Sequence, residues 1–65
     1  MNVTYDPKTD TVSVIFNPGA VAESDVDKPG IILDYDRNGR LVGLEILDAS
    51  KQVADLTRVQ FNVAV

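Results

Sequence analysis

The stretch Asp34-Tyr35-Asp36-Arg37-Asn38-Gly39, followed after five residues by Glu45, decides the fold because it fits two incompatible structures. It satisfies the calcium-loop pattern D-x-[DN]-x-[DN]-G-x5-E, in which oxygen ligands bind the ion; here they would be Asp34, Asp36, Asn38 and Glu45. It also places Asn-Gly between two apolar runs, residues 30–33 and 41–46, which is the strongest short-range signal for a tight β-hairpin.

The flanking residues favour the hairpin. A calcium loop of the EF-hand kind needs amphipathic helices on both sides, whereas Ile31-Ile32-Leu33 is rich in β-branched residues and follows Pro29-Gly30. A two-residue type I′ turn at Asn38-Gly39 would pair Leu33 with Leu44, Asp34 with Gly43 and Tyr35 with Val42. Because side chains alternate, one face would then hold Ile31, Leu33, Tyr35, Val42, Leu44 and Ile46. The other would hold Ile32, Asp34, Asp36, Leu41, Gly43 and Glu45.

The rest of the chain also shows strand periodicity. Residues 2–5 and 11–16 alternate around the turn at residues 6–10, and they predict a hairpin that pairs Tyr5 with Val12 and Val3 with Val14. Residues 20–27 form a weaker strand or an extended loop, and their acidic side chains suit an exposed edge. Residues 48–54 predict a short helix with Asp48 as its N-cap. Residues 58–65 alternate again and predict a final strand, with a helix from Asp48 onward as the competing interpretation.

These elements predict a mostly β (α+β) fold in one small domain, residues 1–65. Its architecture is an antiparallel meander of two to three hairpins, with one short helix near residues 48–54 and a C-terminal strand. So small a core, with no cysteine for a disulfide and no histidine for a metal site, favours self-association as the remaining common way to stabilise it. We therefore expect a homo-oligomer.

Composition excludes several classes of function. The net charge is −4 and the chain has no basic stripe, which argues against direct nucleic-acid binding. No apolar run approaches the length of a membrane span, and no signal peptide is recognisable, so we expect a cytoplasmic protein. The serines lack a histidine base, which leaves no catalytic residue and no cofactor to predict.

The remaining candidates are carboxylates and one glycine. Asp34, Asp36 and Glu45 fall on one face of the second hairpin, where they could bind a divalent cation weakly, act as acid and base, or simply stay hydrated. Gly43 lies inside a strand, which indicates a bulge or the close approach of another backbone. A second subunit could supply that backbone.

The ordered residues resemble a known family. Tyr5-Asp6, Asp10, residues 12–14, Glu23-Ser24, residues 30–36, Gly39 and residues 42–50 together are similar to the domain of unknown function 2283 family of small bacterial domains. The resemblance covers residues 3 to 51 and is most specific from Asp34 to Ser50. It implies a small β domain with a short helix and no established activity. Some relatives resemble antitoxin partners of small toxin proteins.

Two functions follow as hypotheses. The first is a non-enzymatic protein-interaction module that forms a homo-oligomer and engages a basic partner, such as a toxin, through Glu23, Asp25 and Asp27. The second is a weak cation- or ligand-binding domain that uses Asp34, Asp36 and Glu45.

Overall fold

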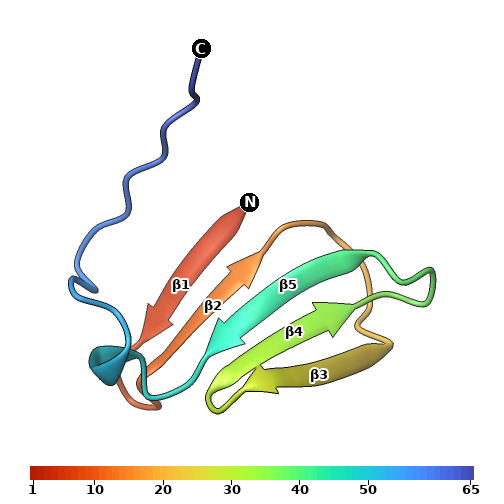
Figure 1. Ribbon diagram of the computed structural model, residues 1–65, viewed down its shortest axis with the longest axis horizontal. Helices are drawn as coiled ribbons and strands as arrows, with labels where there is room; N and C mark the ends of the chain where they lie inside the picture. Colours follow the sequence, from red (N-terminus) through yellow and green to blue (C-terminus); the bar gives the residue numbers. More distant parts are fainter.

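Five antiparallel strands form one sheet in the computed structural model, which describes residues 1–65 (Figure 1). The strands are β1 (Asn2–Asp6), β2 (Thr11–Ile15), β3 (Glu23–Lys28), β4 (Ile31–Tyr35) and β5 (Leu41–Ile46). Their order across the sheet is β1-β2-β5-β4-β3, so a β1–β2 hairpin joins a β3-β4-β5 meander through pairing of β2 with β5. This confirms the predicted mostly β, antiparallel class.

The first hairpin has the register that its alternation predicted. Tyr5 pairs with Val12, and Val3 pairs with Val14. The turn between the strands is closed locally, because the Asp6 carboxylate accepts the Lys8 N–H at 2.9 Å. Asp10 completes the turn in a left-handed conformation with φ of 52°, which Asp adopts more readily than most residues.

The second hairpin differs from its prediction near the turn. Leu33 pairs with Leu44 and Asp34 with Gly43, as predicted, but Tyr35 pairs with Leu41. The predicted Tyr35–Val42 pair is therefore wrong, and Val42 is the extra residue of a bulge. The predicted type I′ turn is also wrong, because only Gly39, with φ of 78°, has the positive φ that such a turn needs at both central residues.

The Asp36 side chain explains this longer turn. Its Oδ1 accepts the N–H groups of Asn38 and Arg40, both at 2.9 Å. The Asp36 N–H in turn donates to the Arg40 carbonyl oxygen at 2.9 Å, which encloses three residues instead of two. An aspartate that bonds its own turn is typical of this position. Local side-chain chemistry thus overrides the Asn-Gly preference.

The sheet is joined at its centre by close contact between β2 and β5. A Cβ atom built on Gly43 would lie 2.6 Å from the Val14 carbonyl oxygen. The close approach predicted for Gly43 is therefore real, but β2 of the same chain makes it and no second subunit is needed.

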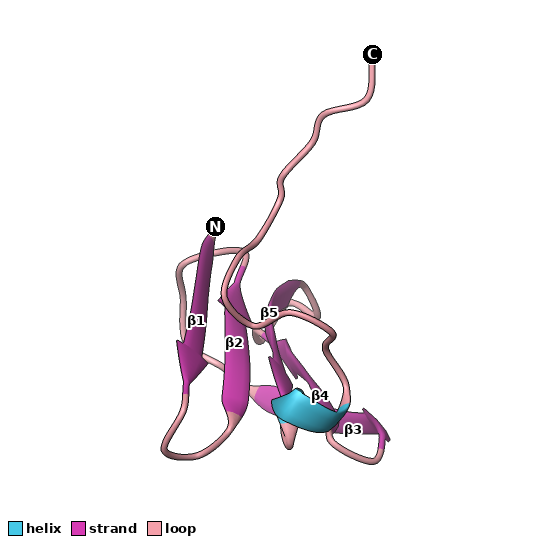
Figure 2. Ribbon diagram, turned by 90° about the vertical axis from the view of Figure 1, so that its left-hand side faces the viewer, coloured by secondary structure: helices cyan, strands magenta, loops and turns pink.

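The predicted helix is reduced to a single 3-10 turn, η1 (Ala49–Lys51). Asp48 occupies the predicted N-cap position, but it has a left-handed conformation and its side chain makes no capping bond. The predicted strand over residues 58–65 is also wrong: that segment forms neither strand nor helix and runs away from the sheet (Figure 2). A strand needs a neighbour to bond, and residues 58–65 pair with no strand of the sheet. No helix of this chain has the length and apolar character needed to cross a membrane.

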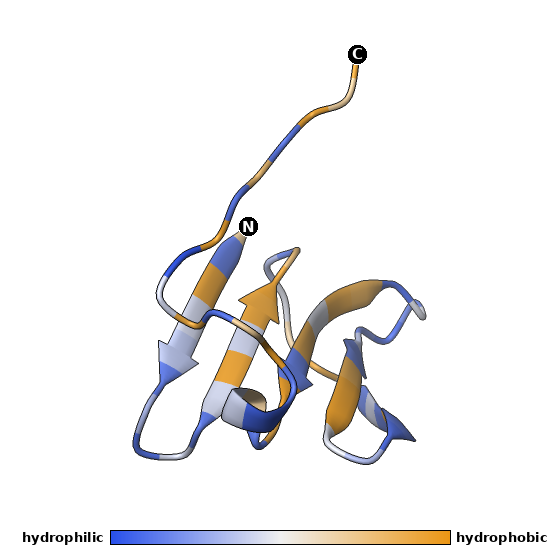
Figure 3. Ribbon diagram, turned by 60° about the vertical axis from the view of Figure 1, so that its left-hand side comes forward, coloured by the Kyte–Doolittle hydropathy of each residue, from blue (hydrophilic) through white to orange (hydrophobic).

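One face of the sheet is apolar. Cross-strand pairing puts eight apolar side chains on it, which we call the apolar face: Val3, Tyr5, Val12, Val14, Ile31, Leu33, Leu44 and Ile46. Figure 3 shows the corresponding alternation of hydrophobic and hydrophilic residues along the strands. Only Val12 of the eight is buried. Val53 and Leu56, from the segment after η1, line a cavity with Val3, Tyr5 and Val12 and so cover part of this face.

Candidate functional site

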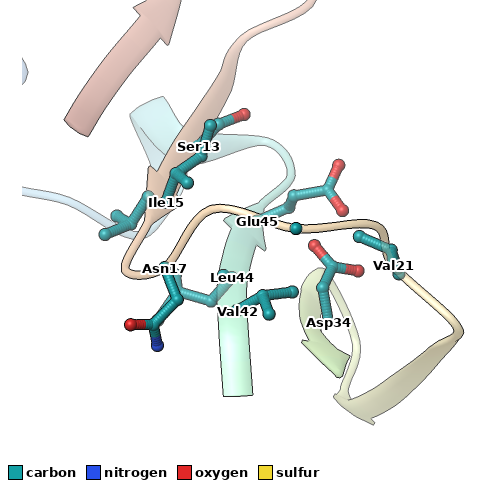
Figure 4. Close-up of a pocket in the computed structure, with 11 residues that line it drawn as sticks. Ser13, Ile15, Asn17, Val21, Asp34, Val42, Leu44 and Glu45 are labelled. Atoms are coloured by element: carbon teal, nitrogen blue, oxygen red, sulfur yellow. The ribbon is translucent and has the colours of Figure 1, made fainter. Parts of the chain in front are cut away.

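The most enclosed polar group lies on the opposite face, under the β2–β3 connection. A cavity of about 240 Å³ is bounded by residues of β2, β4, β5 and that connection, including Ser13, Val21, Asp34, Val42 and Glu45 (Figure 4). The connection is fixed at its start, where the N–H groups of Phe16 and Asn17 donate to the Val42 carbonyl oxygen. Asp34 keeps only 8% of its surface exposed and is the one charged residue among the buried residues.

Sheet register explains why Asp34 and Glu45 meet there. Asp34 pairs with Gly43, two residues from Glu45, so the two carboxylates are diagonal neighbours on the same face. In Figure 4 both side chains reach into the space beneath the connection. Gly43 contributes no side chain between them. Ser24, opposite Asp34 on β3, donates its hydroxyl to Asp34 Oδ1 at 2.6 Å.

This arrangement changes the acidity of Glu45. Its pKa is raised, first by a hydrogen bond with Asp34, then by burial, and then by repulsion from the Asp34 charge. The raised pKa favours the protonated form of Glu45, whose carboxyl group can donate a hydrogen bond to Asp34.

We expect Glu45→Gln to stabilise the protein at neutral pH and to remove part of its pH dependence. Because the folded-state pKa exceeds the ordinary value of 4.5, the folded protein binds this proton more tightly than the unfolded chain does. Stability is therefore lost as pH rises from 4.5 through the raised pKa, and a neutral amide avoids that loss. Thermal unfolding between pH 4 and pH 8 measures the effect. Glu23→Gln, at an exposed position, should leave the profile unchanged; an equal change in both variants would contradict the expectation.

The structure does not bring Asp36 to the other two carboxylates of the proposed cation site. Asp36 is engaged in its own turn, where the Arg40 N–H is the main cause of its lowered pKa, and the Arg40 guanidinium lies 3.4 Å from its Oδ2. No group of three acidic, histidine or cysteine side chains is placed to hold a metal ion. Binding of an ion by Asp34, Asp36 and Glu45 stays a prediction.

The predicted partner-binding acids lie together on the edge strand β3. Glu23 and Asp25 pair with Tyr35 and Leu33 and point to one side, while Asp27 occupies the bulge between Val26 and Lys28. All six residues of β3 are exposed. Neither ion pair of the chain involves this strand, so its three carboxylates keep their charge available to another molecule.

Sequence reasoning missed a second polar cluster, which holds η1 to the first hairpin. Tyr5 Oη donates to Asp10 Oδ1 at 2.8 Å, and Ser50 Oγ donates to Asp10 Oδ2 at 2.7 Å. The Ser50 N–H also donates to Oδ1 at 3.0 Å. These bonds lower the pKa of Asp10, the Ser50 hydroxyl most strongly, and the bond to Asp10 raises the pKa of Tyr5. The one available signal was that all three residues belong to the pattern that carries the family resemblance.

Comparisons with known proteins agree with that resemblance. The uncharacterised protein MJ0789 of Methanocaldococcus jannaschii is 37% identical over 51 residues, which is 78% of this chain and 43% of that protein. The chain thus spans less than half the length of this relative. No solved structure matches the present chain. The family described as "Protein of unknown function (DUF2283)" matches residues 2–50, a span that contains all five strands and both polar clusters. The chain therefore belongs to the DUF2283 family.

Proposed function

We propose that this protein is a non-enzymatic, cytoplasmic interaction module that works as a homo-oligomer and binds a basic protein, in the manner of an antitoxin that holds a basic toxin. One observation carries the proposal: the sheet is a single layer whose apolar face is covered only in part. Of the eight side chains on that face only Val12 is buried, and no large side chain anywhere in the chain is fully buried.

Surface area supports self-association. The accessible surface is 5191 Å², whereas a folded monomer of this mass has about 4,100 Å². The excess includes partly exposed residues of the apolar face and the exposed residues 58–65. Contiguous apolar surface of this kind is typical of protein–protein contact sites. Packing two apolar faces together would form the second layer that a sheet with one apolar face requires.

Charge supports a basic partner. Glu23, Asp25 and Asp27 lie exposed along an open sheet edge, without an ion-pair partner in the chain. Acids on an edge discourage pairing with another copy of the same strand. They also attract a positively charged surface and accelerate its encounter. Asp25 pairs with Leu33, so the acidic edge borders the apolar face.

Light scattering tests the homo-oligomer. The unmodified protein should have the mass of a dimer or larger, and Leu33→Lys, on the apolar face, should reduce it to a monomer. Val26→Lys is the matched control, because Val26 pairs with Ile32 on the opposite face. Circular dichroism verifies that both variants keep the sheet. A single-chain mass for the unmodified protein would contradict the proposal.

Binding measurements test the basic partner. Each basic protein encoded beside the gene is purified and its association measured at low and high salt. We expect salt-sensitive binding to one of them, with association at least about tenfold slower for the triple variant Glu23→Lys, Asp25→Lys and Asp27→Lys. Asp48→Lys, at an exposed position away from β3, is compared with Asp25→Lys alone as a control of equal net charge. Absence of salt-sensitive binding to any neighbour would refute this part of the proposal.

A second candidate function is weak binding of a cation or small ligand by the predicted carboxylates, and the cavity between Asp34 and Glu45 favours it. A calcium titration followed by calorimetry, with the melting temperature recorded in parallel, is the test. Release of heat and a higher melting temperature would support it, and their absence would remove it.

A further inference from the structure

The two edges of the sheet are protected to different degrees. The edge at β3 carries three acids and a bulge, both of which hinder the addition of another strand. The edge at β1 pairs only with β2, has no bulge, and carries a single charged residue, Asp6. Its outward backbone N–H and C=O groups are open to a further strand.

Residues 58–65, which we call the arm, have the sequence of a strand that lacks a partner. Val59, Phe61, Val63 and Val65 alternate with Arg58, Gln60, Asn62 and Ala64, and the segment contains neither proline nor glycine. All four of these large apolar side chains are exposed, Phe61 to 73%. Figure 3 shows the alternation along the arm where it extends beyond the sheet. Strict alternation of this kind is typical of a half-buried strand.

We infer that the arm of one chain adds as an antiparallel strand to the β1 edge of a second copy. The inference rests on the proposed homo-oligomer and adds to its packing of apolar faces a second contact, between the arm and the β1 edge. In the register that we assign, Arg58 lies opposite Asp6, Gln60 opposite Thr4, and Phe61 opposite Val3.

Three features select this register. Opposite residues share a face, so Val59 and Phe61 extend the apolar face beyond Tyr5 and Val3, while Gln60 joins the polar side chain of Thr4. A slip of one residue would move the aromatic side chain of Phe61 to the polar face. A slip of two residues keeps the alternation but loses the pairing of Arg58 with Asp6. Arg58 can give up its ion pair with Asp55 for one with Asp6, because the Arg58–Asp55 pair is long, at 3.7 Å, and exposed.

The course of the arm favours a second copy over the chain's own β1. Val53 and Leu56 line a cavity with Val3, Tyr5 and Val12, so the segment before the arm crosses the face of its own sheet. Val59 borders the same cavity and leaves it in the exchange. From there the arm continues past the N-terminal end of β1 and away from the sheet (Figures 1 and 2). To reach its own edge it would have to turn back. A second copy needs no such reversal.

Thiol cross-linking tests the inference, because the chain has no cysteine of its own. Full-length Val3→Cys is mixed with full-length Phe61→Cys and treated with a short bifunctional maleimide. We expect a covalent dimer at a yield at least about tenfold above that of Val26→Cys mixed with Phe61→Cys, since Val26 lies at the far edge of the sheet.

A second test uses charge instead of a cross-linker. The double variant Phe61→Asp with Val63→Asp should weaken assembly at least about tenfold more than the double variant Gln60→Asp with Asn62→Asp, which adds equal charge to the polar side.

Each outcome separates this inference from the proposed function. A selective cross-link between the two variants supports the arm exchange. An oligomer by light scattering without that cross-link overturns the exchange and leaves the homo-oligomer standing. The double variant Val3→Cys with Phe61→Cys provides a further check. If its cross-link forms only within single chains, the arm folds onto its own edge and the exchange is overturned. A monomer that gives no cross-link overturns both.

Discussion

Gly43→Ala should lower the free energy of unfolding by about 2 kcal/mol or more, the largest effect that we expect from a single methyl group in this chain. The added Cβ would lie 2.6 Å from the Val14 carbonyl oxygen, inside the pairing of β2 with β5. That pairing joins the first hairpin to the meander, so the whole sheet depends on it. A domain of this size without a disulfide or metal has roughly 3–5 kcal/mol of stability, and about half of it would be lost.

Thermal unfolding measures this effect, with an expected fall in melting temperature of roughly 8–16 °C. Gly39→Asn is the matched control: nothing lies within 4 Å of a Cβ there, and asparagine tolerates its φ of 78° better than most residues. A Gly43→Ala protein as stable as the control would show that the two strands can separate without cost, contrary to the geometry.

Ala49→Leu should destabilise the protein by about 1–3 kcal/mol through overpacking. Ala49 is the most deeply buried residue of the chain, with 0% of its surface exposed. Its N–H donates to the Asp10 carbonyl oxygen at 2.9 Å, and its own carbonyl oxygen accepts the N–H groups of Gln52 and Val53. A larger side chain would push η1 away from the first hairpin and break these bonds together with those of Ser50.

Lys51→Leu provides the comparison, since Lys51 lies in the same turn but is exposed. We expect it to change the melting temperature little, because surface substitutions are usually within about 0.5 kcal/mol. Hydrogen exchange adds a specific readout: the Ala49 and Ser50 amides should lose protection in Ala49→Leu. Equal stability of the two variants would mean that η1 does not hold the segment after β5 against the sheet.

The registers of both hairpins were accessible from sequence because they rest on local alternation. Leu33–Leu44 and Tyr5–Val12 follow from a period of two residues about a short turn. The bulge at Val42 was not accessible, because it arises from hydrogen bonds of the Asp36 carboxylate to Asn38 and Arg40. Those bonds compete with the preferred conformation of the Asn-Gly pair, and sequence patterns do not weigh the two against each other.

The candidate site was predictable only in part. The diagonal approach of Asp34 and Glu45 follows from the hairpin register, whereas the removal of Asp36 from the group follows from the turn. The hydroxyl of Ser24 and the enclosing connection come from outside the hairpin, through the pairing of β3 with β4 and the path of the chain across the sheet. Neither has a signature in local periodicity.

The amino-acid sequence by itself determined that the chain forms antiparallel strands, because alternating side chains can be buried only on one face of a pleated strand. Tertiary structure alone decided the order β1-β2-β5-β4-β3, the meeting of Tyr5, Asp10 and Ser50, and the fate of residues 58–65. These features depend on contacts between residues far apart in the chain. Alternation makes a segment competent to be a strand, and a neighbouring backbone with free hydrogen-bonding groups is what makes it one.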